Sequence, residues 1–267
     1  MFNTHFGFTA TPFSKSIRSS DVLQTPPLKE LVARLSVVTR ERGIAVVTGD
    51  VGSGKSTAVR AFLASLDPSR HIILQLSAPL ATPAALYRSL LFAVNQQPPF
   101  GTTAQIAALR QTFNDLQDKR MLPLIVIDEA HLLPPALIDP LRTLLAAHLD
   151  SQSLAALILI GQSDLRRMLH MQPLQAFAQR ITARAHLEPL SLEHTLAYLA
   201  HHLKLAGGSS DALFADDAKQ HIADYAHGIP RRINQIANAA LIAAAAEKKK
   251  IVDDAAVRRA LNDLEQE

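Results

Sequence analysis

The chain has 267 residues and 48% of them are hydrophobic, so it can bury the core of one large domain or of two modest ones. It has no cysteine, which excludes disulfide bonds and thiolate metal sites. Its formal net charge of +3 is too small to indicate a nucleic-acid-binding face by composition alone. Neither a secretory leader nor an apolar run of roughly 18–20 residues is evident, so we expect a cytoplasmic protein without an integral membrane segment.

Between residues 43 and 188, short apolar runs alternate with amphipathic stretches of helical period. Apolar runs without polar alternation are typical of strands that are buried on both faces. A strand–helix–strand rhythm favours a parallel sheet covered by helices. We therefore predict an α/β core over 43–189 with a parallel five-stranded sheet; its strands are expected at 43–49, 71–77, 122–130, 154–161 and 181–188, and two of its helices at 82–95 and 103–117.

After residue 190 the pattern becomes helical. Ser191 is a typical N-cap residue, and Pro230 suits the first turn of a helix. No strand is evident in this part of the chain. The sequence predicts a small all-helical lid domain over 190–267, with helices at 191–208, 215–228, 230–250 and 252–267.

The stretch "GDVGSGKST" follows the first predicted strand and precedes a helix predicted at 56–66. It matches the pattern G-x-x-x-x-G-K-[ST], in which glycines let backbone N–H groups surround phosphate oxygens at the positive end of a helix. In that pattern Lys55 reaches the β- and γ-phosphates of ATP, and the Ser56 hydroxyl holds Mg²⁺. The alternative is a plain turn between a strand and a helix. We predict a nucleotide-binding loop that comprises Gly49, Asp50, Val51, Gly52, Ser53, Gly54, Lys55, Ser56 and Thr57.

The run "LIVIDEA" places two acidic residues at the end of an apolar strand. A carboxylate there is costly unless it serves a cation, so Asp128 is the candidate Mg²⁺ ligand beside Ser56. Side chains at adjacent strand positions diverge, so Glu129 is expected to face the water that attacks the γ-phosphate. The alternative is a strand that simply ends in polar residues. "DEAH" also resembles a helicase motif, but we find no second helicase core.

Polar side chains also follow the next predicted strand, in "LILIGQSD". Gln162 or Ser163 is expected to sense the γ-phosphate there. The alternative is an ordinary turn in which Asp164 caps the following helix.

Arginines occur at two further places. Arg180 and Arg184 lie before and on the last predicted strand, and Arg231 and Arg232 begin a helix of the lid. An arginine at a subunit edge can stabilise charge on a neighbour's nucleotide, and one on a mobile domain can report whether ATP is bound. The alternative for each is a solvated side chain.

Taken together, the motifs "GIAVVTGDVGSGKST", "IVIDEAHLLPP", "LILIGQSDL", "QRITAR" and "GIPRRIN" resemble AAA+ ATPases, and more narrowly the ExeA (general secretion pathway protein A) group. The resemblance covers essentially the whole chain. It implies Mg²⁺-dependent ATP hydrolysis with Glu129 as the catalytic base, Lys55 and Ser56 at the nucleotide, and Gln162 as the first sensor, where many relatives carry asparagine. It further implies Arg180 as the finger that acts on a neighbouring subunit and Arg231 as the second sensor, with Arg184 and Arg232 as the alternates.

The resemblance also implies an N-terminal segment, over 1–42, that packs with its first helix on the nucleotide site. In that arrangement Phe8, Pro12 and Phe13 lie near the adenine. The alternative is a hydrophobic staple of these residues onto a core.

The resemblance leaves several partners open. No membrane segment or cell-wall-binding module follows, and in this the chain is similar to transposition helpers such as MuB, TnsC and IstB. That similarity implies a homo-oligomer, a ring or a filament, that forms with ATP. It also implies double-stranded DNA and a transposase as partners. The first alternative is a soluble ExeA-like ATPase that assists a secretion or envelope complex, and the second is a scaffold that hydrolyses ATP poorly. The candidate DNA contacts are Arg110, Lys119, Arg120, Arg142 and the cluster "EKKK" at 247–250, although lysines also suit a helix C-terminus.

Overall fold

The computed structural model describes residues 2–14, 16–147, 152–208 and 213–265 and divides into two compact units. The α/β unit comprises Pro26–Val51 and Lys55–Leu187. The helical unit comprises Met1–Thr25, Gly52–Gly54 and Glu188–Glu267. The N-terminal segment predicted over 1–42 is thus divided between the units, because its first part packs with the helices and its long helix packs on the sheet.

The α/β unit contains a parallel five-stranded sheet, which confirms the predicted fold class. The central strand β6 and its neighbour β1 are buried along their whole length, as expected for strands covered on both faces. The strand order is β2-β3-β6-β1-β7, so the chain crosses from one side of β1 to the other between β6 and β7. The strands are β1 (Ile44–Gly49), β2 (His71–Ser77), β3 (Leu122–Asp128), β6 (Ala156–Gly161) and β7 (Ile181–Leu187).

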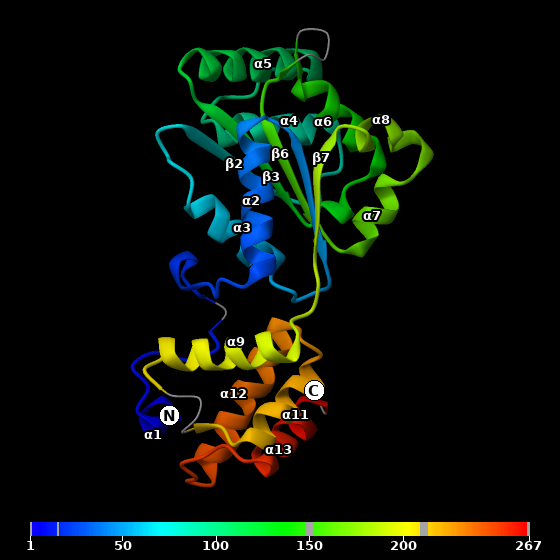
Figure 1. Cartoon of the computed structure of the whole chain (residues 1–267). Coiled ribbons are helices and arrows are strands. Elements are labelled where there is room, and N and C mark those ends of the chain that lie inside the picture. The colour runs from blue at the N-terminus through cyan, green and yellow to red at the C-terminus, as the bar shows by residue number, and fades with distance from the viewer. Residues whose placement is uncertain (1, 15, 148–151, 209–212, 266–267) are drawn as a thin grey trace. The chain divides into compact units, whose positions relative to one another are not determined.

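Helices cover both faces of this sheet (Figure 1). Helix α2 (Pro26–Arg40) and helix α3 (Lys55–Ala64) pack on one face, against β1, β6 and β7. Alternate strand residues such as Val46 and Ile127 face the opposite side, where they join the main core cluster. That side is covered by α4 (Pro83–Ala93), α5 (Thr102–Asp118), α6 (Ile138–Leu145), α7 (Ser163–Leu169) and α8 (Gln175–Ala178).

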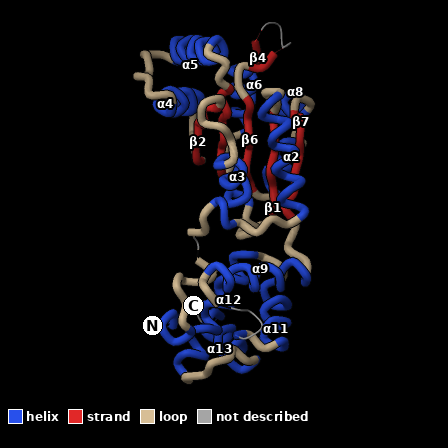
Figure 2. Tube along the Cα trace, turned by 60° about the vertical axis from the view of Figure 1, so that its left-hand side comes forward, coloured by secondary structure: helices blue, strands red, loops and turns tan. Residues whose placement is uncertain are grey.

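Short elements connect these helices to the sheet. The short 3-10 helices are η2 (Ala130–Leu132), η3 (Pro135–Leu137) and η5 (Gln172–Leu174), and a two-stranded antiparallel ladder joins β4 (Ala146–Ala147) to β5 (Gln152–Ser153). The tube view shows β4 beside α6, at the end of the unit where the large sheet's strands begin (Figure 2).

The helical unit has its own core, formed by apolar faces of four helices. An isolated bridge between Phe214 and Val252 adds one extended contact where we expected none. No helix in the described ranges is long and apolar enough to cross a membrane. The elements are α1 (Phe2–Phe6), η1 (Ser19–Asp21), α9 (Leu192–Leu205), α11 (Asp216–Ala226), α12 (Pro230–Ala246) and α13 (Asp254–Glu265).

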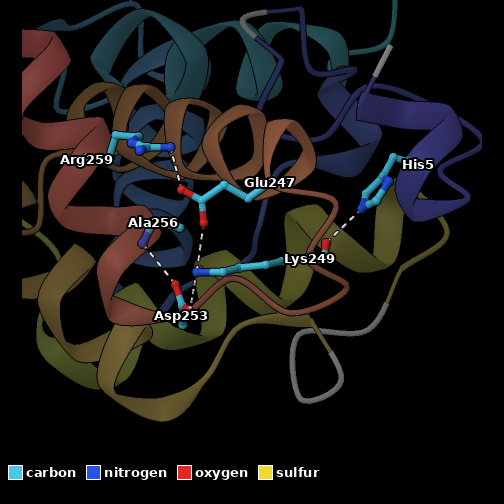
Figure 3. A network of polar contacts seen from close by, with 6 residues as sticks. All are labelled: His5, Glu247, Lys249, Asp253, Ala256 and Arg259. Carbon is cyan, nitrogen blue, oxygen red and sulfur yellow. Dashed lines mark hydrogen bonds and ion pairs between the residues drawn. The ribbon is translucent and has the colours of Figure 1, made fainter.

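A polar network closes the connection between α12 and α13 (Figure 3). The Lys249 ammonium pairs with the carboxylates of Glu247, at 2.9 Å, and Asp253, at 2.8 Å. Hydrogen bonding to Lys249 lowers the pKa of both carboxyl groups and raises the pKa of the lysine. Arg259 also pairs with Glu247. Within the predicted "EKKK" cluster, Lys249 therefore has a structural role as an ion-pair partner.

Phe13 and His202 form the centre of the contact between the N-terminal segment and α9. Phe13 is 1% exposed and stacks on the His202 ring, with centroids 5.5 Å apart and planes 17° apart. The histidine ring also contacts Tyr198, with centroids 4.3 Å apart and planes tilted by 44°. Phe13 therefore occupies the core of the helical unit, as in the hydrophobic-staple alternative.

Burial of His202 predicts a loss of stability in mild acid. Burial, and secondarily the nearby His201, lower the pKa of His202 to about 4. The unfolded chain takes up this proton below about pH 6.5 whereas the folded chain does not, so the free energy of unfolding decreases as the pH falls. We expect a loss of about 2 kcal/mol between pH 7.5 and pH 5 from this one residue.

Urea unfolding of the parent chain and of His202→Leu, followed by tyrosine fluorescence at both pH values, measures this effect. The leucine variant should lack this part of the pH dependence. The exposed His170 provides the matched control, because His170→Leu should retain the parental pH dependence. Equal losses in the parent and in His202→Leu would show that His202 does not cause the acid sensitivity.

Candidate functional site

The glycine-rich loop joins β1 to α3 and is organised by the side chain of Lys55. The Lys55 ammonium donates hydrogen bonds to the carbonyl oxygens of Gly49, at 2.8 Å, and Asp50, at 2.7 Å. Lys55 is only 8% exposed. Gly52 and Gly54 have φ angles of +82° and +92°, which L side chains rarely adopt, so glycine is required for the loop to turn into the helix.

Three features of this loop suit the binding of an anion. The Ser53 hydroxyl oxygen is buried, and it has no hydrogen-bond partner among the residues that the structure describes. A Cβ built on Gly54 would meet no atom within 4 Å, so there is open space beside its backbone. The first N–H groups of α3 carry a partial positive charge and have no partner inside the helix. The loop therefore fits a phosphate group.

Ser56 and Asp128 line one cavity of about 370 Å³ beside the loop. The parallel register sets Asp128 opposite Ser77 of β2, and Ser77 lines the same cavity. One carboxylate oxygen of Asp128 accepts a hydrogen bond from the Glu129 N–H at 2.8 Å, which restrains the carboxyl group. Hydroxyl and carboxylate oxygens are the ligands that Mg²⁺ prefers, so this pair fits the predicted metal site.

Strand β3 ends at Asp128, two residues before the predicted strand end at 130, so Glu129 lies just beyond it. Its φ of +53° is left-handed, and the short helix η2 begins at the next residue. The Glu129 and Asp128 side chains therefore diverge because the backbone turns at Glu129, and not because of the side-chain alternation of a strand, as we had expected. The Glu129 side chain is 47% exposed, and one of its carboxylate oxygens lies 3.4 Å from Nδ1 of His131.

Gln162 lies near the same histidine. It is the N-cap residue of α7, and its backbone N–H donates to Nδ1 of His131 at 3.4 Å. Asp164, in the first turn of α7, pairs with Arg167, and this hydrogen bond lowers the pKa of the aspartate. The end of β6 and the end of β3 are therefore joined through His131.

Arg180 lies at the end of the sheet where the strands begin, opposite to the end that carries Ser56 and Asp128. It precedes β7 and lines a cavity of about 540 Å³ with Ile44 and Leu122, which are the first residues of β1 and β3. Since Ser56 and Asp128 follow the carboxyl ends of their strands, the structure separates Arg180 from them. The cavity also contains three further arginines: Arg40, Arg42 and Arg142.

The alternate arginines have different surroundings. The Arg184 guanidinium donates to the Ala178 carbonyl oxygen at 2.8 Å, which ties β7 to α8. In the helical unit, the backbone N–H of Arg231 donates to the carbonyl oxygen of Gly52 at 3.2 Å. Arg231 thus contacts a loop residue through its backbone, at the first turn of α12. Its predicted role as a sensor and that of Arg180 as a finger remain predictions.

Besides Lys249, two arginines among the predicted DNA contacts are bound within the protein. Arg110 donates to the Thr143 carbonyl oxygen at 2.7 Å, and Arg142 pairs with Asp139 at 3.0 Å. Lys119 caps the C-terminus of α5, and Arg120 follows it with a φ of +59°. Their contact with DNA remains a prediction.

Sequence reasoning assigned no role to His131, Arg40 or Arg42, and it proposed Arg142 as a DNA contact without placing it beside Arg180. The stretch "DEAH" could have pointed to His131 as a site residue, because the histidine follows the predicted base, Glu129, by two positions. The arginine cavity had no such signal, since Arg40, Arg142 and Arg180 come from segments that only the folded sheet brings together.

Comparisons with known proteins agree with this geometry. Residues 38–169 match the family model described as "AAA domain". The chain is also 34% identical over 254 residues to general secretion pathway protein A of Aeromonas hydrophila. That alignment covers 91% of this chain and 45% of the relative, so the chain spans about half the length of the relative it matches.

Solved structures share the fold. Cdc6p from Pyrobaculum aerophilum is similar with a TM-score of 0.72 and 18% identity, over 94% of this chain and 70% of that one. The Aeropyrum pernix ORC1 protein in complex with DNA gives a TM-score of 0.67 and 19% identity, over 92% of this chain and 67% of that one. At these identities the likeness establishes the AAA-type P-loop fold, and the predicted five-stranded core is that fold.

Proposed function

We propose that this chain binds ATP with Mg²⁺ and hydrolyses it, and that the ATP state controls its assembly with copies of itself and with a protein partner. The observation that carries the proposal is the cavity shared by Ser56 and Asp128, next to the loop that Lys55 organises. A buried lysine, a hydroxyl and a strand-end carboxylate in this arrangement suit a nucleotide triphosphate and its metal ion.

Each residue has a role that follows from its place. The loop N–H groups and Lys55 would hold the phosphates, and Ser56 and Asp128 would hold Mg²⁺. Bound Mg²⁺ supplies charge neutralisation on the phosphate oxygens. Glu129, whose side chain is half exposed, would orient the attacking water and accept its proton. Gln162 would sense the γ-phosphate, while Arg180 of a neighbouring copy and Arg231 would add positive charge.

A secretion or envelope complex is the partner we propose. Support comes from the 34% identity to a general secretion pathway protein, which favours this reading over the transposition helper expected from the sequence. The chain spans 45% of that relative, so the relative's full activity is not transferred. Location at a membrane through such a partner is compatible with this proposal.

One set of measurements on the purified chain tests the proposal. We expect Mg²⁺-dependent binding of a fluorescent ATP analogue, release of phosphate from ATP, and a larger particle by size exclusion with ATP than with ADP or no nucleotide. Labelled duplex DNA, measured by anisotropy across a salt series in the same nucleotide states, tests the transposition reading. ATP-dependent, salt-sensitive DNA binding would favour that reading, and failure to bind ATP would refute the ATPase itself.

A further inference from the structure

One imidazole nitrogen in this site has two neighbours with opposite requirements. Nδ1 of His131 lies 3.4 Å from a carboxylate oxygen of Glu129 and 3.4 Å from the backbone nitrogen of Gln162. The carboxylate accepts hydrogen bonds only, so it requires a proton on Nδ1. The Gln162 N–H donates, so it requires a lone pair on the same atom. A neutral imidazole therefore satisfies one neighbour at a time.

The surroundings restrict this competition to side-chain movement. The His131 side chain is 8% exposed, whereas that of Glu129 is 47% exposed. The Glu129 N–H is already bound to Asp128. A Cβ on Gly161 would lie 3.2 Å from the His131 backbone nitrogen and 2.9 Å from a Leu165 methyl carbon, so the backbones are closely packed here. The Glu129 carboxyl group is the part with room to move, whereas the buried ring can change partners by carrying its proton on the other nitrogen.

We infer that His131 is a positioning residue that couples the end of β6 to the catalytic base. With the proton on Nδ1, the ring holds the Glu129 carboxylate in a resting position. With the proton on Nε2, Nδ1 accepts from the Gln162 N–H, and Glu129 is released to orient water. A ligand that shifts the Gln162 backbone therefore changes the availability of the base. The inference rests on the proposed ATPase function.

The partner of His131 Nδ1 can be determined from the tautomer of the ring, without measuring ATP hydrolysis. Imidazole-¹⁵N-labelled protein at about pH 8, where an ordinary histidine is neutral, reports the tautomer of the ring by NMR. His131→Leu identifies the signal. We expect Glu129→Ala to shift the ring toward the Nε2–H tautomer. Gln162→Pro should shift it toward the Nδ1–H tautomer, because proline removes the competing N–H and suits the φ of −79° at this position.

Gln162→Ala is the matched control, since it removes the side chain and keeps the N–H. Its tautomer should equal that of the parent. An unchanged tautomer in both Glu129→Ala and Gln162→Pro would overturn the inference, whether or not the chain hydrolyses ATP.

Steady-state kinetics then test the coupling. His131→Leu should raise kcat several-fold in the absence of a partner and leave the KM for ATP near the parental value. Gln162→Pro should have a lower kcat than Gln162→Ala, and this difference should vanish in the His131→Leu background. Persistence of the difference there, or a fall in kcat for His131→Leu, would contradict the coupling. A parent that binds no ATP would instead refute the proposed function, and the tautomer measurement would still decide the role of His131.

Discussion

Glu129→Gln should lower the rate of ATP hydrolysis by about 10²–10⁴-fold and leave ATP binding intact. The amide keeps the shape of the side chain but has no useful affinity for a proton. Binding should persist because the phosphate and metal contacts belong to the loop and to Asp128, and the substitution keeps the Glu129 backbone N–H that binds Asp128. With hydrolysis blocked, the ATP-bound assembly should accumulate.

Phosphate release, binding of a fluorescent ATP analogue and size exclusion measure the three parts of this expectation. Glu193 is exposed at the first turn of α9, so Glu193→Gln is the matched control and should behave as the parent. Hydrolysis by Glu129→Gln at the parental rate would show that another group acts as the base.

Lys55→Ala should weaken ATP binding by about 100-fold, which corresponds to about 3 kcal/mol. The variant loses the cation that would bind the phosphates. It also leaves the carbonyl oxygens of Gly49 and Asp50 without the donor that now binds them at 2.8 and 2.7 Å. Part of the loss is therefore a less ordered loop.

Titration with the fluorescent ATP analogue, with and without Mg²⁺, measures the affinity. Thermal unfolding by circular dichroism shows whether the variant is folded, so that weaker binding is not mistaken for unfolding. Lys29→Ala, on the exposed side of α2, is the matched control and should bind as the parent does. Parental affinity in a folded Lys55→Ala protein would be incompatible with the predicted nucleotide site.

The sequence alone determined the elements and the family of folds. Five apolar runs became the five parallel strands within two residues at each end, because strands buried on both faces need continuous apolar side chains. The loop at 49–57 was recognisable for a similar reason, since its glycines and lysine are adjacent in the chain. Ser56 and Asp128 were also proposed together from the sequence, because a carboxylate at the end of an apolar strand is costly unless it serves a cation, and both residues line one cavity.

Tertiary structure decided what depends on contacts between distant segments. Phe13 lies in the core of the helical unit, where it stacks on His202, because packing area rather than local pattern determines where an aromatic side chain is buried. The shared nitrogen of His131 depends on the approach of Gln162, which is 31 residues away from the histidine in the chain. Such contacts depend on how the strands are ordered in the sheet, and residue patterns within one segment do not encode that order.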